Sequence, residues 1–332
     1  AALLGLAAVA APAATTAERR WPAAARRRLL GLAATLLLAP AALLFRPAPA
    51  APGAPPERLR IVTYNVHCGA GVDGDLDLEA IARTIEAASP EVVALQEASR
   101  GWLVNGGVDL VAWLARRLAM PHVVFGGHAG RTWGNAVLSR RPFLAAAVEP
   151  LPPADLAIPR GLIDVRLPLD GGVLTLLATH LHAGDGTASG AVRLRQVAAL
   201  RRRLAGPPAA RHTVIAGDLN AAPGAAAIAR LRRAGLIDAW SEAGVGDGET
   251  YPSPAARERI DYLWITPDLA VSKVRVLPSL ASDHLPLTAE IRLRGPAGSR
   301  EEPALTGNRA SYLRTRPRSR QISHRHSPLG MK

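Results

Sequence analysis

The chain has 332 residues, of which 48% are hydrophobic and 20% are charged, a balance that is typical of a folded globular protein and excludes a disordered or collagen-like chain. Cys68 is its single cysteine, which excludes an intramolecular disulfide framework and a cysteine-rich zinc site. The net charge of +13 lies mostly at the two ends: residues 1–60 carry eight Arg against two Glu, residues 297–332 carry seven Arg and one Lys against two Glu, and residues 61–296 hold 24 basic and 23 acidic residues. Residues 61–296 therefore lack the excess of positive charge that attracts a nucleic-acid backbone.

An uncharged apolar run occupies residues 29–45, directly after the three arginines at residues 26–28, and a Pro/Ala-rich stretch follows it. Its seventeen residues are at the lower edge of what spans a bilayer, and the same run can be a signal-peptide core with a cleavage point at Ala50. The preceding arginines place the chain after the run outside the cytoplasm. We therefore expect residues 1–51 to be a membrane anchor or signal region with a spacer, so that the later domain is held at the cell membrane or, after cleavage, secreted.

Strands and helices alternate through the middle of the sequence. In chain order we expect a strand at residues 61–65, a helix at 77–88, a strand at 92–95, a helix at 109–118, strands near 123 and at 136–138, 162–167 and 173–179, a basic amphipathic helix at 191–204, and strands at 213–216, 260–265, 271–277 and 286–293. Many strands with few helices between them predict stacked sheets flanked by helices. We expect a catalytic domain at residues 52–296 and a basic, disordered tail at residues 297–332.

Polar clusters follow six of these strands, at the ends where an α/β scaffold presents reactive groups. Each cluster alone is a weak signal, because a polar residue after a strand is commonly a turn former. The six are Thr63-Tyr64-Asn65, Gln96-Glu97, Gly134-Asn135, Thr179-His180-Leu181-His182, Gly217-Asp218-Leu219-Asn220 and Ser282-Asp283-His284.

Taken together, these clusters form the ordered series YNVH, LQE, GNAVLSRRP, THLH, GDLN, IDYLW and SDHLPL, which spans residues 59–293. The series resembles the endonuclease/exonuclease/phosphatase superfamily, the fold of pancreatic deoxyribonuclease, bacterial neutral sphingomyelinases and inositol-phosphate phosphatases. The resemblance implies an α/β, four-layered sandwich of two packed mixed β-sheets flanked by helices. It also implies metal-dependent hydrolysis of phosphate esters, here by a membrane-anchored or exported bacterial member.

Phosphate-ester hydrolysis needs a hard cation, a base for the attacking water and donors that hold the phosphate. Glu97 ends a buried-type strand, which suits Mg²⁺ or Mn²⁺, because these ions keep several waters and take few protein ligands. Asp218 and Asn220 lie two residues apart, so both side chains share a face if the strand continues. Arg160, in PRGLIDV, can clamp a phosphate.

The remaining roles come from the resemblance. It implies catalytic roles for His180, Asp218, Asn220, Asp261 and His284, with Asp218 on the attacking water and Asp261 orienting the His284 ring. It implies that Asn65 and Asn135 contact or support the phosphate. One or two ions would be held by Glu97, Asn65 and Asp283.

The substrate stays open at this point. GDLN is followed by Ala221, Ala222 and Pro223, without the aromatic residue and Arg of inositol-phosphate phosphatases, and Tyr64 and His180 differ from the residues usual in abasic-site endonucleases. We expect an extracytoplasmic phosphodiesterase or phosphatase, with a lipid headgroup or nucleic acid as substrate and no protein partner inferred. A secreted or membrane-tethered nuclease is the alternative, and a catalytically silent adaptor is a third hypothesis.

Overall fold

The computed structural model describes residues 24, 27, 28, 53–205 and 211–294. By its contacts the chain divides into two units, Ala1–Gly53 and Ala54–Lys332. The expected anchor at residues 29–45 and the expected tail at residues 297–332 lie outside the described residues. Within the described ranges, none of the helices has the length and apolar character that a membrane span needs.

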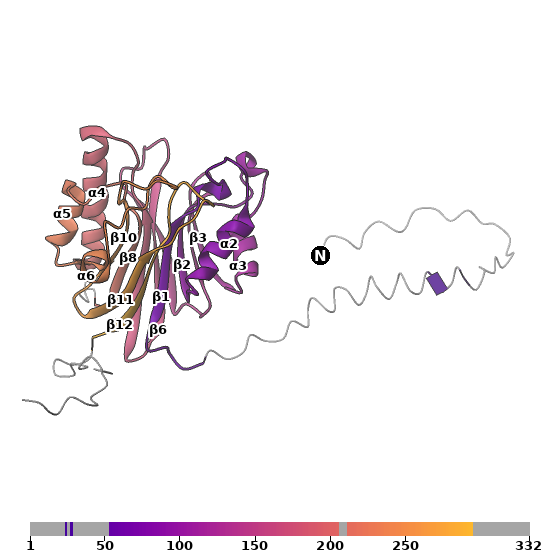
Figure 1. The fold of residues 1–332 in the computed structure, drawn as a ribbon, viewed down its shortest axis with the longest axis horizontal. Coiled ribbons are helices and arrows are strands. Elements are labelled where there is room, and N and C mark those ends of the chain that lie inside the picture. Colours follow the sequence, from indigo (N-terminus) through magenta and orange to yellow (C-terminus); the bar gives the residue numbers. More distant parts are fainter. Residues whose placement is uncertain (1–23, 25–26, 29–52, 206–210, 295–332) are drawn as a thin grey trace, which may run out of the picture. The chain divides into compact units, whose positions relative to one another are not determined.

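Two six-stranded sheets form the centre of the second unit (Figure 1). The first sheet has the order β11 (Leu269–Val276), β12 (Leu287–Leu293), β1 (Leu59–Asn65), β2 (Val92–Ser99), β4 (Trp133–Ser139) and β3 (His122–Ala129). The second sheet has the order β5 (Ala145–Leu151), β6 (Arg160–Leu169), β7 (Gly172–His180), β8 (Thr213–Asp218), β10 (Asp261–Ile265) and β9 (Ile237–Asp238). Both sheets are mixed, because β1 and β2 run parallel, as do β7 and β8, while the other pairs are antiparallel.

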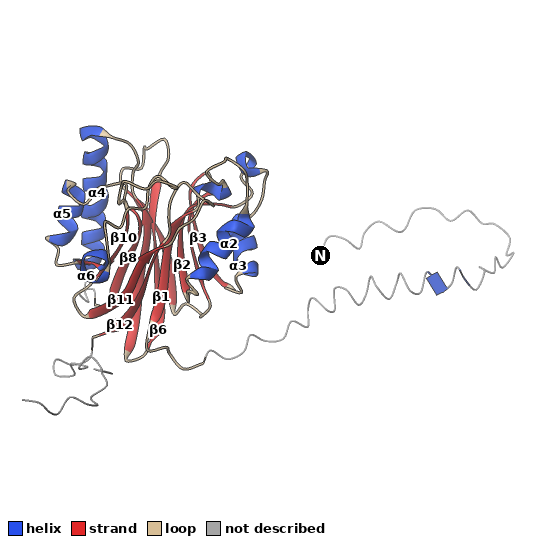
Figure 2. Cartoon of the chain, in the orientation of Figure 1, coloured by secondary structure: helices blue, strands red, loops and turns tan. Residues whose placement is uncertain are grey.

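Helices cover the outer faces of both sheets, as Figure 2 shows. Helices α2 (Leu78–Ala87) and α3 (Leu110–Arg117) lie on the first sheet, and α4 (Gly186–Ala205) and α5 (Ala226–Arg232) lie on the second, while α6 (Ala239–Ala243) follows β9. Asp77 and Asp109 start α2 and α3 as side-chain caps, each accepting a hydrogen bond of 2.8 Å from a backbone N–H three residues on. Such a cap stabilises a helix by about 1 kcal/mol.

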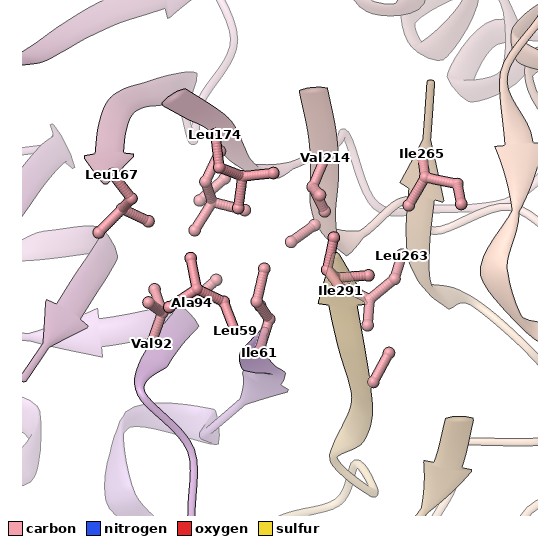
Figure 3. Close-up of a cluster of buried hydrophobic side chains, with 14 of the residues drawn as sticks. Leu59, Ile61, Val92, Ala94, Leu167, Leu174, Val214, Leu263, Ile265 and Ile291 are labelled. Carbon is pink, nitrogen blue, oxygen red and sulfur yellow. The ribbon is translucent and has the colours of Figure 1, made fainter. Parts of the chain in front are cut away.

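The largest hydrophobic cluster lies between the two sheets (Figure 3). Ile61 and Ile291 of the first sheet face Val214 and Leu263 of the second in this layer, and all four side chains are fully buried. Replacing one of these large side chains by Ala would cost about 2–5 kcal/mol of unfolding free energy, since it leaves a cavity between two rigid layers. The two sheets are therefore held in a fixed position relative to each other, and this also fixes the positions of the loops at their ends.

Two further clusters complete the layers. Ile81 and Ile85 of α2 and Leu114 of α3 pack on the outer face of the first sheet. Leu200 of α4 and Ile228 of α5 pack on the outer face of the second. The expected four-layered α/β sandwich of two packed mixed sheets with flanking helices is confirmed.

The sequence patterns did not predict several of the strands and helices. Strand β5 reads AAAVEPL, and six of its seven residues are exposed, so it lacks the alternation that marks a half-buried strand. It forms because β6 pairs with it along its whole length. The short elements α5, α6 and β9 were also not expected, and α4 begins five residues before the predicted start at residue 191.

Strand direction brings the polar clusters together. The carboxyl ends of the parallel strands β1 and β2 lie at one end of the first sheet, where Asn65 is opposite Gln96. In the second sheet Asp218 is opposite His180 on one side and Asp261 on the other. Because the two sheets pack face to face, both sets of side chains meet at the same end of the sandwich.

Candidate active site

Asn65 connects the two sheets at this end. Its side chain is buried, and its amide nitrogen donates to Asp218 Oδ2 at 3.1 Å and to Glu97 Oε1 at 3.4 Å, and lies 3.4 Å from His284 Nε2. Its amide oxygen accepts from the backbone N–H of His67 at 3.1 Å, which fixes the orientation of the amide. One side chain therefore touches residues from four separate sequence motifs.

Asp261, His284 and Asp218 form a buried acid–histidine–acid arrangement. His284 Nδ1 lies 2.9 Å from Asp261 Oδ2, and His284 Nε2 lies 3.8 Å from Asp218 Oδ2. Burial alone would lower the pKa of His284, but Asp261 first and Asp218 next outweigh it and raise that pKa to about 10. The ring of Tyr251 covers the imidazole, with 4.8 Å between ring centroids. The arrangement keeps an imidazolium in place at neutral pH.

Asp218 has the properties of a base for neutral pH. Burial, and then the charge of Asp261, raise the pKa of Asp218 to about 7, against the lowering effects of His284 and of two hydrogen bonds. Its Oδ1 accepts from the backbone N–H of Asn220 at 2.8 Å. A carboxylate with a pKa near the working pH is basic enough to take a proton from water and still be ionised in a large fraction of molecules.

His180 and Asn220 form a second pair beside Asp218. The amide nitrogen of Asn220 lies 2.9 Å from His180 Nε2 and donates to the Leu181 carbonyl at 3.2 Å. Burial, followed by the charges of Arg160 and His284, holds the pKa of His180 well below its usual value, so the ring is neutral. Nε2 also lies 3.4 Å from Asp218 Oδ2, and the buried Nδ1 has no hydrogen-bond partner among the described residues. The site thus holds a buried ring nitrogen without a described partner.

Backbone strain occurs at the same residues. Glu97 has φ +52° at a bulge of β2, where the pairing with β4 shifts register, and Asn220 has φ +48°. Left-handed backbone at a non-glycine residue costs on the order of 1 kcal/mol or more and persists only where the surroundings enforce it. At Gly217, φ is +150° and a Cβ would lie 1.8 Å from the Thr179 carbonyl oxygen, so only glycine allows β7 and β8 to approach there. These features aim Glu97 and Asn220 into the site.

Arg160 begins β6 with its guanidinium buried. Its side chain is 5% exposed and lies over the Trp133 ring, with Cζ 5.2 Å from the ring centroid. Within the described part of the chain, Nε and Nη1 have no hydrogen-bond partner, and burial lowers the pKa of the group. A buried cation with unused donors is costly, and an anionic ligand would relieve that cost.

Asn135 lies near Arg160 but is already engaged. Its amide nitrogen donates to the carbonyl of Gly161 at 3.3 Å, as the Thr179 hydroxyl does at 3.1 Å. Both contacts hold the start of β6, next to Arg160. This geometry favours support of the site over direct contact between the Asn135 nitrogen and a phosphate.

Two half-buried carboxylates lie on the open side of Asn65. Glu97 contacts the Asn65 amide, and Asp283 Oδ1 lies 3.3 Å from Ser282 Oγ and 3.8 Å from His67 Nδ1. Oxygen ligands with room for water are what Mg²⁺ and Mn²⁺ require, so Glu97 and Asp283 fit such an ion, whereas Asn65 turns its amide nitrogen, a donor, toward Glu97. Asp218, Asp261 and His284 also bring their ligand atoms within 4.8 Å of one another. Those atoms contact each other and lie buried, which suits proton transfer better than a hydrated cation.

The structure also adds residues to which the sequence analysis gave no role. Tyr251 comes from a loop far from His284 in sequence, and no local pattern marks it. His128 packs against Gly161, where a Cβ would lie 1.8 Å from its ring, and burial followed by the charge of Arg160 lowers its pKa to about 4. Ser282 was part of a motif, and its hydroxyl donates to the Asn65 carbonyl at 2.8 Å.

The fold and the site together define a class of phosphate-ester hydrolase. The sequence model of the Endonuclease/Exonuclease/phosphatase family matches residues 62–284, and the chain belongs to that family. Its members are hydrolases of phosphate esters that generally use divalent metals. No curated protein matches the chain at a significant level.

Solved structures of the family share this fold. An endonuclease/exonuclease/phosphatase from Beutenbergia cavernae is 28% identical, with 72% of each chain covered and a TM-score of 0.61. A mannosyl-6-phosphatase from Bacteroides thetaiotaomicron is 18% identical, with 70% of this chain and 99% of that chain covered and a TM-score of 0.58. Sphingomyelinase C from Streptomyces griseocarneus is 21% identical, with 70% and 99% covered and a TM-score of 0.53. The last two show likeness of fold.

Proposed function

We propose that the chain is a divalent-cation-dependent phosphodiesterase or phosphatase in which Asp218 takes the proton of the attacking water. The observation that carries this proposal is the position of the buried Asp218 carboxylate, 3.8 Å from His284 Nε2 and 3.1 Å from the Asn65 amide, where its pKa is raised to about 7. Water adds to phosphorus, its proton passes to Asp218, and the bond from phosphorus to the alcohol oxygen breaks. The alcohol oxygen takes a proton from the solvent.

The other residues hold the phosphate and the proton path. Arg160 lines the open cavity and carries guanidinium donors that no described residue engages, so it can bind a phosphate oxygen, and His180 lies beside Asp218 and Asn220. Asp261 fixes the His284 ring, whose positive charge lies beside Asp218 and stabilises it when ionised. Glu97 and Asp283 would hold Mg²⁺ or Mn²⁺, which would neutralise charge on the phosphate, and Asn65 would hold Glu97 in place through its amide nitrogen.

Hydrolysis by the purified chain tests the proposal. Bis(4-nitrophenyl) phosphate, sphingomyelin, phosphoinositides and plasmid DNA would be compared with Mg²⁺, with Mn²⁺ and with a chelator. We expect turnover that requires the cation and is lost in Asp218→Asn but kept in Asp164→Asn, a matched control in which another buried carboxylate, paired with Arg203, is replaced. Equal activity of Asp218→Asn and the unaltered chain would overturn the proposal. Preference for plasmid DNA would select the nuclease alternative, which the near-neutral residues 61–296 do not favour.

We also propose that the domain acts outside the cytoplasm. Support comes from the uncharged run at residues 29–45 behind three arginines, a sequence feature outside the described residues. A periplasm- or surface-dependent reporter fused after residue 294 would be active if the domain is exported. A reporter that works only in the cytoplasm would overturn the proposal.

A further inference from the structure

A cavity of about 710 Å³ opens beside the proposed phosphate position. Glu97, His67 and Arg160 line one part of it, so the cavity is continuous with the site. Arg160 lines this cavity, and its buried Nε and Nη1 have no hydrogen-bond partner among the described residues. A phosphate bound by Arg160 would therefore have the rest of its molecule directed along the cavity wall.

The remaining wall is largely apolar. Leu76, Trp102, Trp133, Ile158 and Ala183 contribute to it, and Trp133 is held in place by the Arg160 cation over its ring. A sugar or another polyhydroxyl group needs several side-chain partners, whereas this wall offers few: the Asn105 amide nitrogen already donates to Ser99 Oγ and to the Cys68 carbonyl, and the Asn105 oxygen is buried. An apolar group would instead gain about 25 cal/mol for each Å² that it buries.

The apolar surface extends to the rim of the cavity. Leu76 and Ile158 line it and are 45% and 50% exposed, and Leu103, next to Trp102 in the chain, is 88% exposed. Large exposed side chains of this kind cost little singly but mark a binding surface where they gather around a pocket.

We infer that this cavity binds the organic part of the substrate and that this part is an apolar alcohol, as in an alkyl, aryl or lipid phosphate ester. The inference rests on the proposed function for the position of the phosphate. It distinguishes the preferred ester from a nucleotide or a sugar phosphate, whose many polar groups would meet a wall that is mostly apolar.

Ligand binding to the full chain carrying Asp218→Asn tests the inference without turnover. Methyl, butyl and hexyl phosphate would be titrated calorimetrically in the presence of Mg²⁺, with mannose 6-phosphate and thymidine monophosphate as polar comparisons. We expect affinity to rise about fourfold for each methylene that the cavity buries. Equal affinity for methyl and hexyl phosphate, or tighter binding of either polar ester than of hexyl phosphate, would overturn the inference.

A second variant locates the effect. Ile158→Asp, in the same Asp218→Asn background, is expected to reduce the ratio of hexyl to methyl affinity by at least tenfold. Leu144→Asp is the matched control, because Leu144 is 58% exposed and lies outside the cavity lining, and it should leave the ratio unchanged. A ratio that Ile158→Asp does not change would overturn the assignment to this cavity.

Failure of the proposed function would look different. Turnover of bis(4-nitrophenyl) phosphate by the chain with Asp218 intact measures that function directly. An active enzyme without dependence on chain length would overturn only the cavity inference. An inactive enzyme that still binds hexyl phosphate in preference to methyl phosphate would overturn only the proposed function.

Discussion

Asn65 separates two groups of carboxylates that have the same chemistry and different surroundings. Asp218 and Asp261 are buried on one side, and Glu97 and Asp283 are half-exposed on the other. Burial raises the pKa of Asp218 to about 7, whereas carboxylates with access to solvent can bind a hydrated cation. The comparison shows how one amide can separate the proposed base from the proposed cation site.

The buried side carries a cost in stability. Because the native pKa of Asp218 lies above that of an unfolded chain, the native state binds more protons between the two values. The contribution of this group to the unfolding free energy is therefore full at low pH and is lost as the pH rises through about 7. Ionised Asp218 is the form that the proposed reaction needs, so activity and the stability contribution of this residue change in opposite directions.

The largest effect is expected on the buried side. Asp218→Asn should lower kcat by about 10²–10⁴, because general-base catalysis contributes a factor of this size. Steady-state kinetics on bis(4-nitrophenyl) phosphate would measure it, with circular dichroism to confirm folding. A fall of less than fivefold in a folded variant would show that Asp218 is not the base.

Replacing a carboxylate on the half-exposed side should lower the affinity of the protein for the divalent cation. Glu97→Gln is expected to weaken Mg²⁺ or Mn²⁺ binding by at least about tenfold, since even groups that only orient metal ligands contribute 10–100-fold. Calorimetric titration of the cation measures this without turnover. Glu149→Gln, which changes an exposed carboxylate on the edge strand β5, is the control and should bind the cation normally. Unchanged affinity in Glu97→Gln would move the cation to the buried group.

The pH dependence of kcat/KM tests the role of the buried side, because Asp218 titrates and must be ionised to act. Asp218 must be ionised to act as a base, and its pKa is raised to about 7. We therefore expect kcat/KM to rise about tenfold per pH unit below that value and to level off above it. A profile that is flat from pH 5 to pH 9 would contradict the assignment of the base.

Sequence patterns predicted the layers, and they selected most of the polar residues that the fold brings together. Helices were expected at residues 77–88 and 109–118, and Asn65, Asp218 and His284 lay in motifs at strand ends. The exposed strand β5 left no signal because it depends on pairing with the next strand, β6, and the ring of Tyr251 left none because its partner, His284, is distant in the chain. The sequence also did not show which charged residues are buried. Arg160 was equally consistent with an exposed surface charge, and only the folded structure shows that its Nε and Nη1 lack a partner among the described residues.

The smallest effect should come from Ser282, which joins the two sides through the backbone. Its hydroxyl donates to the Asn65 carbonyl at 2.8 Å and accepts from the His284 N–H at 3.2 Å. Ser282→Ala leaves a buried N–H without its acceptor, so we expect a loss of about 1–3 kcal/mol in unfolding free energy.

Activity should fall less than tenfold in Ser282→Ala, because the contact between Asp261 and His284 and the contact between Asn65 and Asp218 remain. Urea denaturation and steady-state kinetics measure the two effects separately, with Ser272→Ala on the exposed surface of β11 as the control. If activity instead fell as far as in Asp218→Asn while the fold stayed intact, the backbone link between the two sides would be as important to the reaction as the base itself.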